Sequence, residues 1–366
     1  MSTGTATPVE ESGRPRRLWV RALQVTVGLG LAVAMLGWGL PYFAQTSWSE
    51  VFDILGTVPL WKALLFLGLV VAGLYCYTFV MTGAMPGLSH PRALILNVCG
   101  SSVSNLLPGG GAVGLAATYT IAKSWGFSVA SVTTMAVVTG VWNVLARVML
   151  PIIAVLGLAW AATDLPATMR EAAWAAVVSG LAIVAGFVLA VATDRGARVV
   201  GRLADRVVRL VRRGHGSQIE RGLTGLRSRV AETVRTGWLS MTLGMVGFFG
   251  LYYVLFVLCM QTTGIELPFG QLFAAYAIGR LLTAVGVTPG GLGVTETGTA
   301  AALVAWGADP AASMAGVVIF SIFTHLTEVP LGALGWLAWS LMPKATAAEV
   351  SEAHLAGRAQ ASSRRT

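Results

Sequence analysis

Four charged side chains stand inside strongly apolar stretches of this sequence, where a charge is costly to bury. They are Arg147, Arg280, Glu296 and Glu328. Ionisable groups at membrane depth usually mark a transport pathway or a paired site. One interpretation is that the arginines bind an anionic headgroup while Glu296 or Glu328 carries a proton or a counter-cation. The other is that all four form internal salt bridges that hold a helix bundle together.

Patterns typical of catalysis are missing from the sequence. It contains no HExxH zinc motif, no aspartate-rich motif for a magnesium-bound diphosphate, no GxSG serine site and no Walker lysine motif. His325 and Glu328 lie one helical turn apart, a spacing that allows a shared metal ion or proton but is more often a buried polar contact. Cys76, Cys99 and Cys259 lie in apolar segments without metal or redox spacing. We therefore expect no enzyme, no cofactor and no metal site.

The composition is that of a membrane protein. Hydrophobic residues make up 55% of the chain and charged residues only 11%. A bilayer is spanned by about 20 apolar residues, and longer uncharged runs include Ala22–Ser49, Ala63–Pro91, Ala172–Ala192 and Thr236–Ile265. The first run follows a basic segment but is long and lacks a clear small-x-small cleavage site, so we expect a retained helix rather than a signal peptide. The fold class is all-α, a polytopic integral membrane helix bundle.

Two Pro-Gly-Gly breaks interrupt apolar stretches at matching places in the two halves of the chain. The first is Pro108-Gly109-Gly110 and the second, 181 positions later, is Pro289-Gly290-Gly291. The same shift aligns Trp125-Gly126 with Trp306-Gly307. Helix breaks at equivalent positions of two halves point to a transporter-like binding site near the bilayer midplane.

The breaks and the polar residues around them form the predicted substrate-binding site. Free backbone N–H groups after each break suit a phosphate, whereas the alternative is that the glycines only allow close helix packing. Arg280 and Glu296 flank the second break, and Arg147 and Glu328 are equivalent under the shift, so each pair could meet. The candidate residues are Asn105, Pro108, Gly109, Gly110, Arg147, Arg280, Pro289, Gly290, Gly291, Gly293, Glu296 and Glu328.

The charges predict the topology. Residues 195–235 carry eleven arginines against three carboxylates, and further basic residues flank both ends of the apolar region. By the positive-inside rule these segments are cytoplasmic, which places both termini inside and the acidic links near Glu50, Glu266 and Asp309 outside. The expected location is the plasma membrane.

Counting from these anchors gives about six full spans and two re-entrant pairs, or about eight helices. The spans are about 19–40, 61–84, 128 onward with a bend at Pro151, 172–193, 237–262 and 312–341. The short segments 93–107 and 111–123 enter from the cytoplasm, and 271–287 and 292–305 enter from outside. This is an inverted repeat, with repeat one at about 61–160 and repeat two at about 237–341. Residues 1–18 form a basic tail, 19–342 the transmembrane domain, and 343–366 a disordered tail.

The loop at 195–235 contains an arginine stripe with its own helical spacing. Its members, spaced by threes and fours, are Arg195, Arg198, Arg202, Arg206, Arg209 and Arg213. A basic amphipathic helix of this kind lies on a membrane and favours anionic lipid. The alternative is a solvated charged face that only sets the topology. Since stacking aromatic residues are absent from the stripe, we expect no nucleic-acid partner.

The segments Asn105-Leu-Leu-Pro-Gly-Gly-Gly and Pro289-Gly-Gly-Leu-Gly-Val-Thr-Glu296 resemble the transmembrane family that includes the flippase part of lysylphosphatidylglycerol synthases. The resemblance spans roughly residues 20–342 and implies a domain that moves lipids or lipid-linked headgroups between leaflets. It carries over to the two breaks, to Gly293 and Glu296, and to Arg147 as the basic residue on the following helix. The aminoacyl-transfer domain of the bifunctional members has no counterpart here, so lipid synthesis is not expected.

One departure from the family pattern concerns the second half. The segment Phe323-Thr-His-Leu-Thr-Glu328 has no basic residue to match Arg147, which leaves the headgroup preference open. We expect a flippase for an anionic phospholipid or a polyprenyl-phosphate-type lipid, with membrane lipids as partners. The alternatives are an ion-coupled transporter of a small anionic solute and a non-transporting membrane scaffold. The lipid, the driving ion and the oligomeric state stay open.

Overall fold

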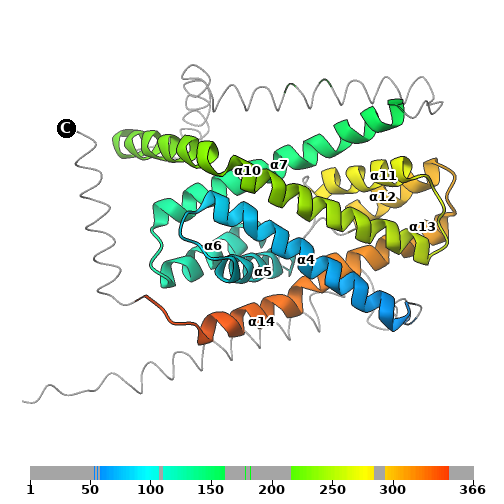
Figure 1. Ribbon diagram of the computed structural model, residues 1–366, viewed down its shortest axis with the longest axis horizontal. Helices are drawn as coiled ribbons and strands as arrows, with labels where there is room; N and C mark the ends of the chain where they lie inside the picture. Colours follow the sequence, from blue (N-terminus) through cyan, green and yellow to red (C-terminus); the bar gives the residue numbers. More distant parts are fainter. Residues whose placement is uncertain are drawn as a thin grey trace, which may run out of the picture.

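The computed structural model describes residues 58–106, 110–160, 216–283 and 293–345, and four single positions, Asp53, Gly56, Val178 and Ala182. Every regular element within them is a helix, as Figure 1 shows. The predicted spans at about 19–40 and 172–193 and the arginine stripe at 195–213 lie outside the four described ranges, as do both predicted tails except residues 343–345.

The first half of the bundle matches the predicted helices closely. Its elements are α4 (Leu60–Ala84), α5 (His90–Leu106), α6 (Gly110–Ser124) and α7 (Val129–Trp160). Pro151 lies inside α7, which continues through it. The two short helices, α5 and α6, are the predicted broken pair.

The second half repeats this order. It comprises α10 (Gly216–Thr262), α11 (Phe269–Leu282), α12 (Val294–Ala305), α13 (Pro310–Ser321), the π-helical turn η4 (Ile322–Leu326) and α14 (Glu328–Leu341). Two bounds differ from the prediction. Helix α10 begins well before residue 237 and takes in residues 216–235 of the predicted loop, and the predicted span at 312–341 is interrupted by η4.

Pro330 explains the position of the interruption. A proline has no N–H to donate to the carbonyl four residues earlier, here that of Leu326, and its ring crowds that carbonyl. The wider turn of η4 ends at Leu326, and Thr327 N–H donates to the Ile322 carbonyl at 3.3 Å. Such π turns inside α-helices often occur at functional sites.

The internal repeat is visible in the backbone hydrogen bonds. Helices α6 and α12 end in the same turn, with Gly126 and Gly307 at φ +88° and +89°. A left-handed residue after a helix is favoured as glycine because it lacks a Cβ atom. The next helices begin with equivalent caps, since Ser128 Oγ accepts from Ser131 N–H and Asp309 Oδ1 from Ala312 N–H. Each pair of positions is 181 residues apart.

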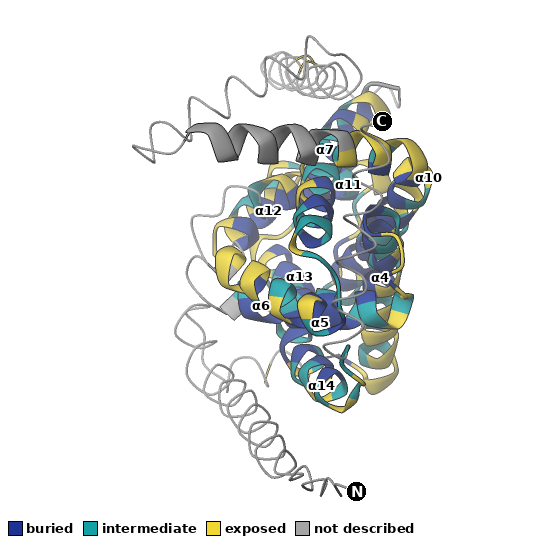
Figure 2. Cartoon of the chain, turned by 90° about the vertical axis from the view of Figure 1, so that its left-hand side faces the viewer, coloured by how far each residue is buried: buried dark blue, intermediate teal, exposed yellow. Residues whose placement is uncertain are grey.

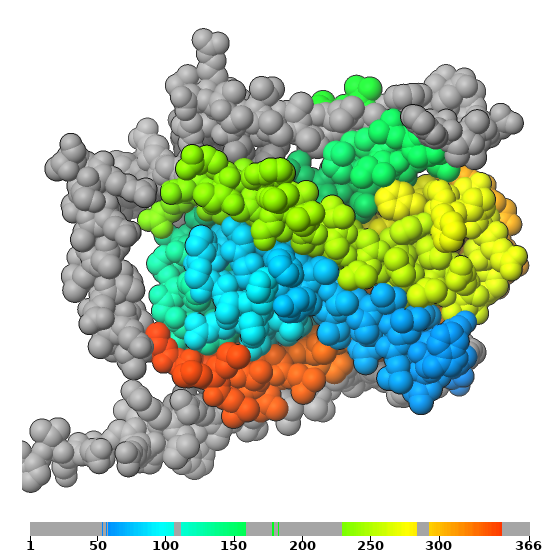
Figure 3. All heavy atoms as spheres, in the orientation of Figure 1, coloured from blue at the N-terminus to red at the C-terminus, as the bar shows by residue number. Residues whose placement is uncertain are grey.

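The equivalent long helices α4 and α10 run antiparallel in close contact. Lys62 Nζ donates to Thr262 Oγ1 at 3.3 Å near one end, and Ser240 Oγ donates to the Phe79 carbonyl at 3.0 Å toward the other. Figure 3 shows the two helices side by side across one face. Because equivalent elements run in opposite directions, the two repeats are inverted.

The two halves exchange their packing partners. Helix α7 of the first half packs on α11 of the second, and α14 of the second half packs on α5 of the first. The short pairs α5–α6 and α11–α12 lie at opposite ends of the molecule in Figure 1. The end of α14 is also held by α6, because Trp339 Nε1 donates to Ser124 Oγ at 2.9 Å and Ala345 N–H to the Ser124 carbonyl at 2.9 Å.

Apolar residues cover the outside of the bundle as well as its interior. Leu60, Trp61 and Leu243 are 75%, 64% and 61% exposed, which suits contact with lipid rather than water. Figure 2 shows the buried positions turned toward the middle. Among the described residues, four helical stretches are long and apolar enough to cross a membrane: Leu60–Ala84, Val129–Leu158, Arg229–Thr262 and Pro310–Leu341.

The inverted arrangement predicts opposite labelling of two equivalent residues. Val129 and Pro310 are exposed first residues of α7 and α13. We expect Val129→Cys to react with an impermeant maleimide only from the cytoplasm and Pro310→Cys only from outside. The parent protein, whose described cysteines are buried or half-buried, measures the background. Labelling of both variants from one side would contradict the inverted repeat.

A second prediction concerns the contact between α4 and α10. A Cβ atom at Gly237 would overlap the Gly83 carbonyl, whereas one at Gly68 on α4 would meet nothing within 4 Å. Helix propensity favours alanine over glycine at both sites. We expect Gly237→Ala to lower the unfolding free energy by about 1–3 kcal/mol through overpacking, and Gly68→Ala to leave it equal or higher. Thermal denaturation in detergent measures both.

Candidate substrate-binding site

Arg147 joins the two halves through hydrogen bonds on both sides. Asn143 lies four residues earlier on α7 and so on the same helix face. The Arg147 Nε donates to Asn143 Oδ1 at 3.0 Å, and Asn143 Nδ2 donates to Tyr77 Oη on α4 at 3.2 Å. The Arg147 Nη1 donates to Thr283 Oγ1 at the end of α11 at 2.6 Å. The guanidinium is therefore fixed in the space between α4, α7 and α11.

Arg280 is buried beside aromatic rings. It is only 8% exposed, and its guanidinium carbon lies 5.5 Å from the ring centre of Tyr276 and 5.0 Å from that of Phe320. Cation–π contacts of this kind favour a cation without neutralising it. Within the described part of the chain, the Arg280 Nε has no hydrogen-bond partner, and neither has the buried hydroxyl of Tyr252.

The two arginines lie near enough to repel each other. Thr283 connects them, because its hydroxyl accepts from Arg147 and donates to the Arg280 carbonyl at 2.6 Å. Glu328 attracts Arg280 across the centre but is bonded elsewhere. Two positive charges and one negative charge therefore interact in the interior between the repeats.

Glu328 follows η4 and lies against the first half. It is 9% exposed, and its Oε2 accepts from Asn105 Nδ2 at the end of α5 at 2.7 Å. This contact mirrors that of Arg147, which reaches the end of α11. The equivalent positions Arg147 and Glu328 thus each bind the short helix of the opposite half.

Glu296 caps α12. Its Oε2 accepts from Gly293 N–H at 2.5 Å, and its Oε1 accepts from Ser321 Oγ on α13. Gly293 has φ +85°, a conformation that a residue with a Cβ atom rarely adopts. A carboxylate at this position satisfies a free N–H of the helix and interacts favourably with the helix dipole. The second half therefore uses Glu296 and Gly293 together to begin α12.

The expected ion pairs are not formed. In the described ranges, neither Arg147 nor Arg280 forms an ion pair with a carboxylate. Glu296 instead binds Gly293 and Ser321, and Glu328 binds Asn105. Arg147 and Glu328 are kept apart because α7 and α14 pack on different neighbours. Helices α11 and α12 do pack on each other, but Glu296 turns back to the start of its own helix. The idea that four charges close the bundle as salt bridges has no support in these contacts.

Most residues of the two breaks cannot be placed in this site. Pro108, Gly109, Pro289, Gly290 and Gly291 lie outside the described residues, and Gly110 is described only as the first residue of α6. Their predicted contact with a headgroup stays a prediction. No group of three His, Cys, Asp or Glu side chains that could hold a metal ion occurs among the positions the structure describes.

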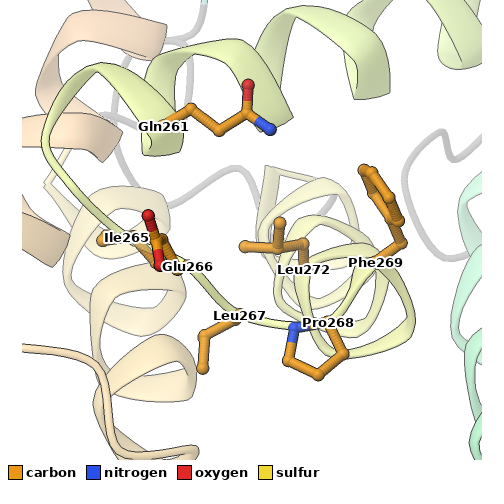
Figure 4. A pocket seen from close by; sticks show the side chains of 7 residues that line it. All are labelled: Gln261, Ile265, Glu266, Leu267, Pro268, Phe269 and Leu272. Carbon is orange, nitrogen blue, oxygen red and sulfur yellow. The ribbon is translucent and has the colours of Figure 1, made fainter.

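Several residues of the site were not predicted from the sequence. Tyr77, Tyr252 and Tyr276 lie in apolar helices, where a tyrosine is ordinary and carries no signal. Thr283 follows Arg280 by one helical turn, and Ser321 follows Phe320, so only their packing reveals their contacts. A separate hollow of about 590 Å³ at the link between α10 and α11 contains none of these residues (Figure 4).

The helices and their interior charges define a polytopic α-helical membrane protein with a polar centre between two inverted repeats. The family model described as the lysylphosphatidylglycerol synthase TM region matches residues 25–332. The chain belongs to this family, as the two Pro-Gly-Gly segments predicted. No curated protein matches it in sequence.

The capping contact predicts different effects of two substitutions at Glu296. Alanine removes both acceptors, so we expect Glu296→Ala to lower the unfolding free energy by about 1 kcal/mol or more. Glutamine keeps a carbonyl that can accept from Gly293 N–H or Ser321, so Glu296→Gln should cost much less. Thermal denaturation in detergent compares them with the parent. Equal losses would mean that the charge, not the cap, holds α12.

Proposed function

We propose that this protein moves a lipid with an anionic headgroup between the leaflets of the plasma membrane. The observation that carries the proposal is the pair of interior arginines, neither of which forms an ion pair with a carboxylate in the described part of the chain. An uncompensated buried charge costs several kcal/mol, so the unliganded bundle is expected to gain from an anion between them. Family membership supports a role in lipid handling.

The charge balance favours a singly charged headgroup. Arg147 and Arg280 face one carboxylate, Glu328, across the interior, so one negative charge neutralises the centre. A phosphodiester has this charge and accepts several hydrogen bonds, which suits the Arg280 Nε and the Tyr252 hydroxyl, neither of which has a hydrogen-bond partner among the described residues. Both phospholipids and lipid-linked phosphates carry such a group.

The packing of α7 supports entry from the side. Only 22% of the most apolar window of α7 is buried, against 39–50% for the other candidate spans. A lipid whose chains stay in the bilayer could therefore approach α7, the helix that carries Arg147, from the side. In this proposal the protein supplies no covalent chemistry, and both of its termini lie in the cytoplasm.

Lipid movement in vesicles tests the proposal. We expect the purified protein to move a fluorescent phosphatidylglycerol across the bilayer of proteoliposomes, as measured by dithionite quenching. Arg147→Ala and Arg280→Ala should slow this movement at least about tenfold, because removing a group that meets a buried charge costs about 2–5 kcal/mol. Arg235→Ala, which removes an exposed arginine of α10, is the matched control and should move lipid at the parent rate.

Thermal stability separates a binding role from a structural one. Since no carboxylate of the described residues forms an ion pair with Arg280, Arg280→Met should melt no earlier than the parent in detergent without lipid. Early melting, with lipid movement in proportion to the folded fraction, would make the arginines structural. A parent protein that moves no lipid but accumulates a small anionic solute would favour a solute transporter, and one that does neither would favour a scaffold.

A further inference from the structure

We infer that Glu296, Ser321 and His325 form a proton-binding site that couples lipid movement to a proton gradient. The coupling rests on the proposed function, but the site itself rests on a chain of side-chain contacts in the second repeat. The three residues lie on α12, at the end of α13 and in η4. The hydrogen bonds of Arg147 and the ring contacts of Arg280, which together form the arginine centre, do not involve these three residues.

The contacts form a continuous path for a proton. Ser321 Oγ donates to Glu296 Oε1 and lies 3.5 Å from His325 Nδ1, and Thr324 Oγ1 lies 3.2 Å from the same nitrogen. A hydroxyl both donates and accepts, so it can connect an imidazole to a carboxylate. When His325 is protonated, its Nδ1–H bond breaks as Ser321 Oγ takes that proton and passes its own to Glu296 Oε1. The charged pair becomes a neutral imidazole and a neutral carboxylic acid.

The repeat itself argues that this path is functional. Under the 181-residue shift, its three members correspond to Leu115, Gly140 and Val144. The first half forms the equivalent helices α6 and α7 with these apolar or small residues. The inverted-repeat fold therefore does not need a carboxylate, a hydroxyl and an imidazole at these positions, and a polar path in only one of two equivalent halves indicates a specific role.

The position of the path connects it to both halves. Glu296 caps α12 in the second repeat, while Glu328, at the other end of η4, binds Asn105 of the first. Phe320, next to Ser321, contacts Arg280. A change of charge at His325 or Glu296 thus acts directly on η4, the one π turn among the described helices, and on the neighbours of the arginine centre.

The charges around the path set its response to pH. On the helices packed near the path, the charged groups include Arg280 on α11 and Glu328 on α14. On α4, which contacts η4 through Phe66 and Phe323, the cation is Lys62, whose ammonium donates to Thr262. The first part of α10, before its apolar stretch, carries Glu220, Arg221, Arg227, Arg229, Glu232 and Arg235. The other titratable groups on the packed helices are tyrosines and cysteines: Tyr75, Cys76 and Tyr77 on α4, Tyr252, Tyr253 and Cys259 on α10, and Tyr276 on α11.

The test is lipid distribution under an imposed pH gradient. Proteoliposomes with fluorescent phosphatidylglycerol and an internal pH dye are held at zero membrane potential with valinomycin and potassium. We expect a gradient of one pH unit to shift the steady-state lipid distribution by up to about tenfold for one proton per lipid, and proton movement to accompany it. Without a gradient, the lipid should equilibrate evenly.

Variants identify the residues responsible. Glu296→Gln keeps the cap but not the proton site, so it should lose the steady-state response to the gradient whatever its rate of lipid movement, as should His325→Gln and Ser321→Ala. Ser313→Ala is the matched control, since Ser313 is a buried serine on the same helix outside the path, and it should keep the response. Melting temperatures show whether each variant is folded.

The outcomes distinguish the coupling from the proposed function. Lipid movement by the parent that ignores the proton gradient, or that follows a sodium gradient instead, would overturn the proton site and leave the lipid proposal standing. A full response in folded Glu296→Gln and His325→Gln would also overturn it. If the parent moves no lipid in any condition, the proposed function fails and the coupling fails with it.

Discussion

Two guanidinium groups held between apolar helices are the constraint around which the centre of this bundle is organised. A buried charge must be compensated by hydrogen bonds, by aromatic faces or by an opposite charge. Arg147 takes the first route, through Asn143 and Thr283, and Arg280 takes the second, between Tyr276 and Phe320. Neither takes the third within the described residues, and in the proposed function an anionic headgroup would supply that opposite charge.

Local features of the fold could be predicted from the sequence because their causes are local. The starts of α7 and α13 follow from the caps Ser128 and Asp309, and the aligned Trp-Gly pairs mark the same turn after α6 and α12. The inverted orientation could be predicted from the arginine-rich segments, which the positive-inside rule assigns to the cytoplasm, since charge beside a membrane span decides its direction. The family could be recognised from the two short segments that contain the Pro-Gly-Gly breaks.

The partners of the interior charges could not be predicted in the same way. Sequence spacing suggested that Glu296 meets Arg280, but the side chain turns back to Gly293, because a carboxylate three residues into a helix can reach the free N–H at its start. The bond from Asn105 to Glu328 depends on how α14 packs against α5, which no local pattern encodes. The π turn before Pro330 likewise required the backbone itself, although the proline marks its place.

The exchange of α7 and α14 between the halves determines which parts of the protein can travel together. Helix α14 keeps its contacts with the first half only if it moves with α5 and α6, and α7 keeps its main contact with the second half only if it moves with α11. If the protein transports as proposed, each unit that moves therefore combines helices from both halves of the chain. A chain cut between the repeats would separate each mobile unit from one of its own helices, so the duplicated halves are mechanically inseparable.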